Sequence, residues 1–253
     1  MPAAILARLV LLEARRSALP WLAAASIAAA LILAAFLSSV ALTEGRELRL
    51  AVVAALLRAC AVFLVILHVA ASVQREIDDK GLEQMLSLPL PRAVHYLGRL
   101  AGFALCGALL ALVFAAPLAL WAAPAPLAYW TLSLACECAL VAAAALFFSM
   151  GLGQIVGAVS ASVALYVLGR AVAAVQAIAA GPLAAESLPG RLAAHVVDAL
   201  AFVLPRLDAV TRTDWLLYGA PQGGDYAWGL AGLLAYALLV TAAGLVDFYR
   251  RAP

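Results

Sequence analysis

Residues 50–92 have the sequence LAVVAALLRACAVFLVILHVAASVQREIDDKGLEQMLSLPLPR, and the order of apolar and charged stretches within it indicates the kind of fold. The apolar run over residues 50–73 is long enough to cross the hydrocarbon core of a bilayer, which takes about 20 residues of helix. At Gln74 it gives way to the densest block of charge in the chain, which contains the only lysine, Lys80. A second apolar run begins at Leu97. The pattern predicts a charged segment held in water between two membrane-spanning helices.

The composition of the whole chain agrees with this interpretation. Hydrophobic residues make up 67% of the 253 residues and charged residues 12%, and the mean hydropathy is +1.07. A soluble domain is about half apolar and about one quarter charged. One globular core cannot bury so much apolar surface, so the chain is predicted to be an all-α integral membrane protein in contact with lipid. The net charge of +2 is too small to indicate nucleic acid, and no nucleic-acid partner is expected.

Apolar runs predict six membrane-spanning helices in a single domain. They cover residues 18–42, 50–73, 97–121, 130–150, 154–175 and 227–248. In residues 1–17, Arg8 and Arg15 lie seven positions apart and share a helix face, which predicts an amphipathic helix at the membrane surface. A cleavable signal peptide is the alternative, but the run over residues 18–42 is too long for a signal core of about 7–15 residues.

The distribution of positive charge predicts the orientation. If the N-terminus is cytoplasmic, nine arginine and lysine residues outside the spans lie on that side and five lie on the other. The positive-inside rule therefore predicts that both termini and residues 74–96 are cytoplasmic. Residues 176–226 are then extracytoplasmic, and their four prolines exclude a seventh full span. Two short helices are expected there, over residues 191–204 and 214–218, resting on the outer leaflet or dipping into it.

The charged block after residue 73 is predicted to contain a short docking helix. Asp78 and Asp79 lie early in it, where the helix dipole favours anions. Leu82, Met85 and Leu86 then form a narrow apolar stripe, and a proline stops the element three residues later. Such an amphipathic helix is suited to a groove on another protein. A solvated loop is the alternative interpretation.

The same region resembles the connection between the second and third spans of ABC-2 type transporter permeases. The resemblance is carried by Arg75-Glu76, Gly81-Leu82-Glu83-Gln84-Met85-Leu86, Leu88-Pro89, Pro91-Arg92 and Tyr96-Leu97-Gly98-Arg99. It implies an N-terminal elbow helix, six spans, a cytoplasmic coupling helix and short outer helices before the last span. Leu204-Pro205-Arg206-Leu207-Asp208, followed by Asp214-Trp215, further resembles the permeases grouped with multicopper-enzyme maturation. The Asp78-Asp79-Lys80 block is more charged than the usual family pattern.

The resemblance also implies a functional assignment, that of an exporter-type permease subunit in the bacterial cytoplasmic (inner) membrane. A homodimer of the chain would pair with a separate cytoplasmic ABC ATPase. The residues implied to contact this ATPase are Glu76, Asp79, Gly81, Leu82, Glu83, Met85, Leu86 and Pro89. The chain lacks the Gly-x-x-x-x-Gly-Lys-Ser/Thr phosphate-binding loop, so it is not expected to be an enzyme or to hold a cofactor, and ATP would be bound by the partner.

Two functions of other classes are alternatives to transport. One is a non-transporting membrane assembly or accessory factor for the maturation of copper or haem enzymes. The other is an intramembrane enzyme, which would need convergent catalytic groups at matching depth. His68, His95 and His195 fall at different depths of the predicted topology, and this disfavours an enzyme.

Two ionisable residues lie deep inside predicted spans. Arg58 and Glu137 are each about 10–12 Å below the outer surface at 1.5 Å per residue. Charges at such depth usually face the bundle interior and pair, so an Arg58–Glu137 contact is predicted, either structural or lining a substrate path. The alternative is that Arg58 extends outward to the interface. Arg170 is interpreted as an interfacial anchor.

Cysteines and glycines within the spans are assigned packing roles. Cys136 and Cys138 point about 200° apart on one helix, so no metal site is predicted from them. Gly98 with Gly102, and Gly153 with Gly157, place small residues four positions apart and predict close helix contacts.

Overall fold

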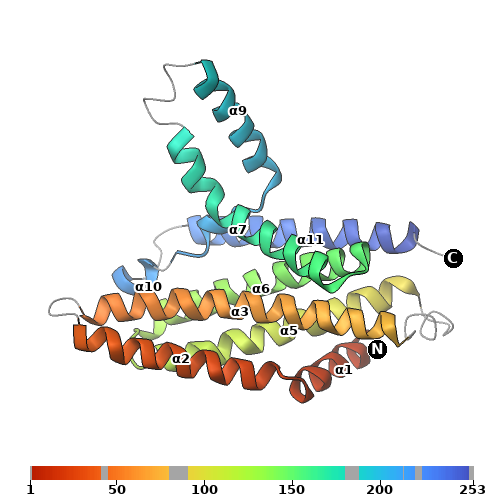
Figure 1. Cartoon of the computed structure of the whole chain (residues 1–253), viewed down its shortest axis with the longest axis horizontal. Coiled ribbons are helices and arrows are strands. Elements are labelled where there is room, and N and C mark those ends of the chain that lie inside the picture. The colour runs from red at the N-terminus through yellow and green to blue at the C-terminus, as the bar shows by residue number, and fades with distance from the viewer. Residues whose placement is uncertain are drawn as a thin grey trace.

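A computed structural model describes residues 2–40, 45–79, 91–179, 188–212, 214–219 and 224–250. All of the regular elements in these ranges are helices (Figure 1). The longer ones are α1 (Pro2–Arg16), α2 (Leu19–Val40), α3 (Gly45–Asp78), α5 (Arg92–Leu118), α6 (Pro124–Leu152), α7 (Ile155–Ala179), α9 (Leu188–Val203) and α11 (Asp225–Arg250). The short ones are the 3-10 turn η1 (Leu207–Ala209) and α10 (Asp214–Tyr218).

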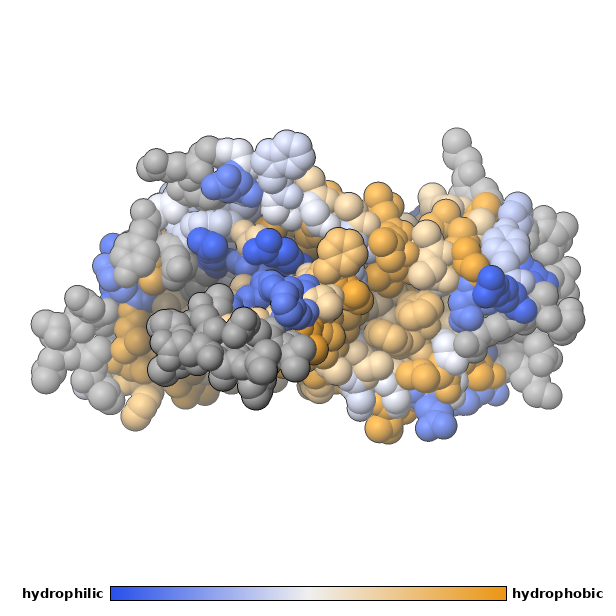
Figure 2. Space-filling view, turned by 90° about the horizontal axis from the view of Figure 1, so that it is seen from above, coloured by the Kyte–Doolittle hydropathy of each residue, from blue (hydrophilic) through white to orange (hydrophobic). Residues whose placement is uncertain are grey.

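Six of these helices, α2, α3, α5, α6, α7 and α11, are long and apolar enough to cross a membrane. The prediction of an all-helical protein with six such helices is therefore confirmed. Figure 2 shows a hydrophobic band across one face of the molecule, with hydrophilic regions to either side of it. This distribution suits a bilayer, in which the band contacts acyl chains and the hydrophilic regions reach water.

Most of these helices extend beyond the apolar runs that predicted them. α3 begins at Gly45 and continues through the charged residues to Asp78. α6 begins at Pro124, because a proline at the first position of a helix loses no hydrogen bond and has a suitable φ. Helical hydrogen bonding therefore continues through the polar ends of the spans, where hydropathy alone gives no signal.

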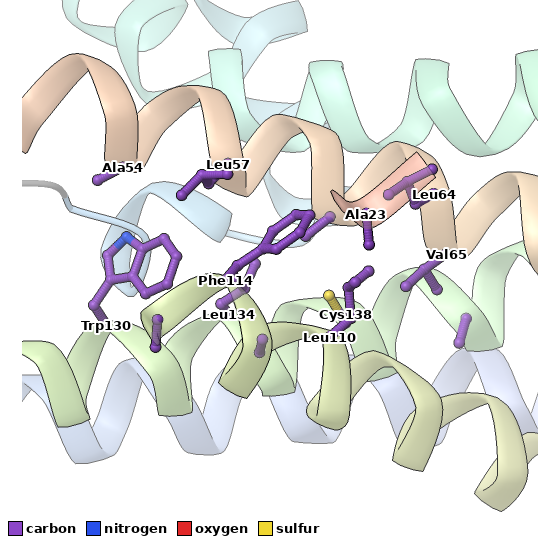
Figure 3. Packing of buried hydrophobic residues seen from close by; sticks show 14 of the residues in the cluster. Ala23, Ala54, Leu57, Leu64, Val65, Leu110, Phe114, Trp130, Leu134 and Cys138 are labelled. Atoms are coloured by element: carbon purple, nitrogen blue, oxygen red, sulfur yellow. The ribbon is translucent and has the colours of Figure 1, made fainter. Parts of the chain in front are cut away.

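The centre of the bundle is built on α3 and α6. Of the most apolar stretch of each helix, 56% is buried in α3 and 61% in α6, against 17% in α2 and in α11. Figure 3 shows Leu57 of α3, Phe114 of α5 and Leu134 of α6 in this core, and all three side chains are fully buried. α2 and α11 thus leave most of their apolar surface uncovered by the rest of the described chain.

Helix α1 packs against the first half of α5 through two glycines. A Cβ atom at Gly102 would lie 2.7 Å from Cβ of Val10, and one at Gly98 would lie 3.1 Å from Cα of Ala3. These contacts leave no room for a side chain, as expected for small residues four positions apart. The prediction for the other glycine pair is wrong. Gly153 ends α6 with a φ of 63°, and a Cβ atom added to it would have nothing within 4 Å, because its role is to terminate the helix.

The second half of α7 and helix α9 form a hairpin that projects from the bundle (Figure 1). Its two helices are joined by a 3.0 Å hydrogen bond that Gln176 Nε2 donates to Asp198 Oδ1. Pro205 follows α9, and its carbonyl oxygen would lie 2.9 Å from a Cβ atom at Gly169 of α7. Two helices were expected within residues 176–226, and the structure has α9 and α10 there. α9 is not a separate element, because it packs on α7.

Candidate intramembrane charge site

The deepest charged site joins the two most buried helices. Arg58 Nη1 of α3 lies 2.6 Å from Glu137 Oε2 of α6, and the side chains are 1% and 0% exposed. The structure thus brings together the two residues that the depth argument paired. Arg58 Nη2 also donates a 3.1 Å hydrogen bond to Ser133 Oγ, one turn before Glu137. The guanidinium lies over the ring of Trp130, 5.3 Å from its centroid.

A second guanidinium approaches the same carboxylate from α7. Arg170 Nη1 lies 3.8 Å from Glu137 Oε1, and the Arg170 side chain is 36% exposed. It also donates a 2.6 Å hydrogen bond to Thr211 Oγ1. The Glu137 carboxylate therefore lies between two guanidinium groups, that of the buried Arg58 and that of the partly exposed Arg170. Sequence reasoning missed this role for Arg170. Its depth in the fifth span, similar to that of Glu137 in the fourth, was the available signal.

The site formed by Arg58, Glu137 and Arg170 restricts how three helices can pack, and it contains more positive than negative groups. A buried ion pair loses the hydration of both partners, and their attraction offsets the loss only when geometry and further hydrogen bonds are good. Ser133, Trp130 and Thr211 supply such contacts. Two guanidiniums against one carboxylate leave a local charge of +1. The site can therefore hold three helices in one register, and it presents a cation on its exposed side.

A second polar cluster lies where α1, the end of α3 and the start of α5 meet. Glu76 of α3 forms an ion pair with Arg99 of α5 and lies 3.7 Å from His95 Nε2. Arg99 Nη2 donates a 3.2 Å hydrogen bond to Ser72 Oγ. Ser72 in turn donates a 2.9 Å hydrogen bond to Glu13 Oε2 of α1. The cluster connects the helices on both sides of the charged segment.

Only part of the predicted ATPase-contacting set belongs to the described structure. Gly81, Leu82, Glu83, Met85, Leu86 and Pro89 lie outside the described residues. Glu76 and Asp79 line a cavity of about 350 Å³ together with residues of α1 and α5. The Glu76 carboxylate is 13% exposed and points toward Arg99, whereas Asp79 is exposed. Asp79 is thus the more accessible of the two.

Other residues singled out by the sequence have packing roles in the structure. His68 packs edge-on against Phe103, with ring centroids 5.7 Å apart. Cys138 is fully buried at a close contact with Gly107, where an added Cβ would lie 2.7 Å from Cys138 Cβ. Within the described ranges, no group of three or more His, Cys, Asp or Glu residues is placed to hold a metal ion.

Comparison of the chain with protein-family models and with curated proteins gives no match.

Proposed function

We propose that the chain is the membrane-spanning permease subunit of an ATP-driven ABC transporter of exporter type. Six membrane-spanning helices and the charged segment between α3 and α5 support this function. The observation that carries it is the ion pair between Glu76, which is partly buried, and the buried Arg99, which joins the two sides of that segment. A docking segment can drive a membrane domain only if its ends are firmly attached to the spans.

The Glu76–Arg99 pair is connected to the core of the bundle through helix α3. Glu76 and Arg58 are both on α3 and are separated by about 27 Å along the helix axis at 1.5 Å per residue. A displacement of residues 80–90 by a partner would therefore be transmitted along α3 toward the Arg58–Glu137 pair. A partner that binds two states differently shifts the equilibrium between them. In this proposal the pair is one of the contacts that distinguish those states.

The remaining features of the proposal follow from the resemblance and from the charge distribution. A separate ATPase binds and hydrolyses ATP, two copies of the chain form the permease, and the complex lies in the bacterial cytoplasmic membrane. The excess of arginine and lysine on one side supports a cytoplasmic location for residues 74–96 and for both termini. The packing of α1 on α5 supports its role as an elbow helix at the membrane surface.

Purification of the chain from its native membrane tests the proposal. We expect an ATPase with a phosphate-binding loop to co-purify and to be stimulated when it is mixed with the chain. A preparation that carries an apo-metalloenzyme and no ATPase, without stimulation on mixing, would contradict transport and would favour the assembly-factor alternative.

Substitutions in the docking segment test the coupling contact. Glu83→Lys and Leu86→Asp are expected to abolish co-purification of the ATPase while the chain still folds and inserts. Glu47→Lys is the control because Glu47 is exposed in the first turn of α3, at the end of that helix far from the charged segment. Unchanged co-purification and transport in both docking variants would exclude this segment as the coupling contact.

A further inference from the structure

An apolar groove of about 540 Å³ lies between α1, α2 and α5, away from both charged clusters. Its walls are mostly aliphatic, and include Leu11, Leu12, Ile27, Leu109, Leu110 and Val113. Only two charged side chains line it, Arg8 and Arg15. One border of the groove is α2, a helix long and apolar enough to cross a membrane, whose most apolar stretch is only 17% buried within the chain.

The two arginines have no acidic partner in the described part of the chain. Ion pairs there join other residues, and the only acidic residue of α1, Glu13, contacts Arg75 and Ser72 at the second polar cluster. Arg8 and Arg15 are both exposed and lie two turns apart on one face of α1. Within the described residues, no acidic side chain therefore neutralises the two arginines that line the groove.

We infer that this groove binds one anionic phospholipid, with an acyl chain along the aliphatic walls and the phosphate beside Arg8 and Arg15. The planar guanidinium group is the side chain best matched to a phosphate, to which it can donate two parallel hydrogen bonds. The apolar walls match an acyl chain, which a free phosphate or an acidic peptide would not need. The lipid would fill the space between α1 and α2 and fix their relative orientation. This inference depends on the membrane location of the chain and not on its transport function.

Native mass spectrometry of the delipidated full-length chain tests the site. Phosphatidylglycerol and phosphatidylcholine with identical acyl chains are titrated separately. We expect one phosphatidylglycerol to bind in preference to phosphatidylcholine. Arg8→Gln with Arg15→Gln should weaken phosphatidylglycerol binding by roughly 25-fold, the product of about fivefold for each arginine near an anionic phosphate. Arg16→Gln is the matched control, because Arg16 is exposed on the same helix and does not line the groove.

A volume substitution gives a second test. Ala24 lines the groove and is exposed on α2, so Ala24→Phe should fill the groove without disturbing the core and should reduce the binding of both lipids. An undiminished preference for phosphatidylglycerol in the double arginine variant would overturn the proposal. So would a lipid-free dimer of the chain that Ala24→Phe dissociates, because that result would assign the groove to a second copy.

Discussion

Replacement of Glu137 should destabilise the bundle more than replacement of Arg58, although the two residues form one ion pair. Glu137 lies between Arg58 and Arg170, so Arg58→Leu leaves the carboxylate with a guanidinium 3.8 Å away. Glu137→Gln instead leaves both guanidiniums without a carboxylate, and the Arg58 side chain is 1% exposed. The two single variants therefore leave different amounts of uncompensated charge.

The expected magnitudes follow from this asymmetry. Removing one partner of a buried ion pair costs about 3–5 kcal/mol of unfolding free energy. We expect Glu137→Gln to fall in that range and Arg58→Leu to cost roughly 2 kcal/mol, since Arg170 still neutralises part of the charge. The double variant should cost less than the sum of the single variants by about 1–3 kcal/mol, because neither charge is left alone.

The assay is reversible unfolding in mixed micelles, followed by tryptophan fluorescence with Trp130 directly beside the Arg58 guanidinium. Arg46→Leu is the control, because Arg46 is on the same helix but is exposed, with a 2.7 Å hydrogen bond to the Trp121 carbonyl. Its expected cost is below about 1 kcal/mol. If the losses of unfolding free energy in the Arg58 and Glu137 variants add up in the double variant, the pair has no coupling energy. That result, or losses no larger than the loss in Arg46→Leu, would contradict a stabilising ion pair at this site.

Three further substitutions test the junction of α1, α3 and α5. Gly102→Leu should lower the unfolding free energy by about 1–3 kcal/mol in the same assay, because its Cβ would lie 2.7 Å from Cβ of Val10. Gly232→Ala is the control, because its new Cβ would have nothing within 4 Å. Equal effects of the two substitutions would show that α1 does not pack at Gly102. Glu76→Gln should cost about 3 kcal/mol because it leaves the mostly buried Arg99 unpaired. Glu13→Gln should cost below about 1 kcal/mol because its partner Arg75 is 55% exposed. The reverse order would show that the junction is held by the exposed pair.

Much of the fold was predictable because the bilayer imposes a simple rule. A run of about 20 apolar residues has few options other than a membrane-spanning helix, since its backbone groups must be satisfied internally. The six runs in the sequence accordingly correspond to six long helices. Helix ends were less predictable, as the extension of α3 to Gly45 and Asp78 shows. Polar residues continue a helix as readily as they end one.

The candidate site was partly predictable for a related reason. Arg58 and Glu137 stood out because charge is costly at their depth, and equal depth suggested a pair. Arg170 did not stand out, because a residue near the end of a span can reach water. The role of Glu76 was also obscured, since the sequence marks it as part of a charged segment but does not show that Arg99 is its partner.

Local hydropathy and charge were enough to predict a membrane-type helical protein, its six long apolar helices and the charged segment between α3 and α5. The tertiary structure was needed to show that Arg170 joins Arg58 at Glu137, and that Glu76 joins α3 to α5. It alone placed Arg8 and Arg15 beside an apolar groove. These features depend on how each helix is rotated about its axis and on which helices it packs against. Small residues such as Gly98 and Gly102 set that packing, because they allow close contact between parts of the chain that are far apart in sequence.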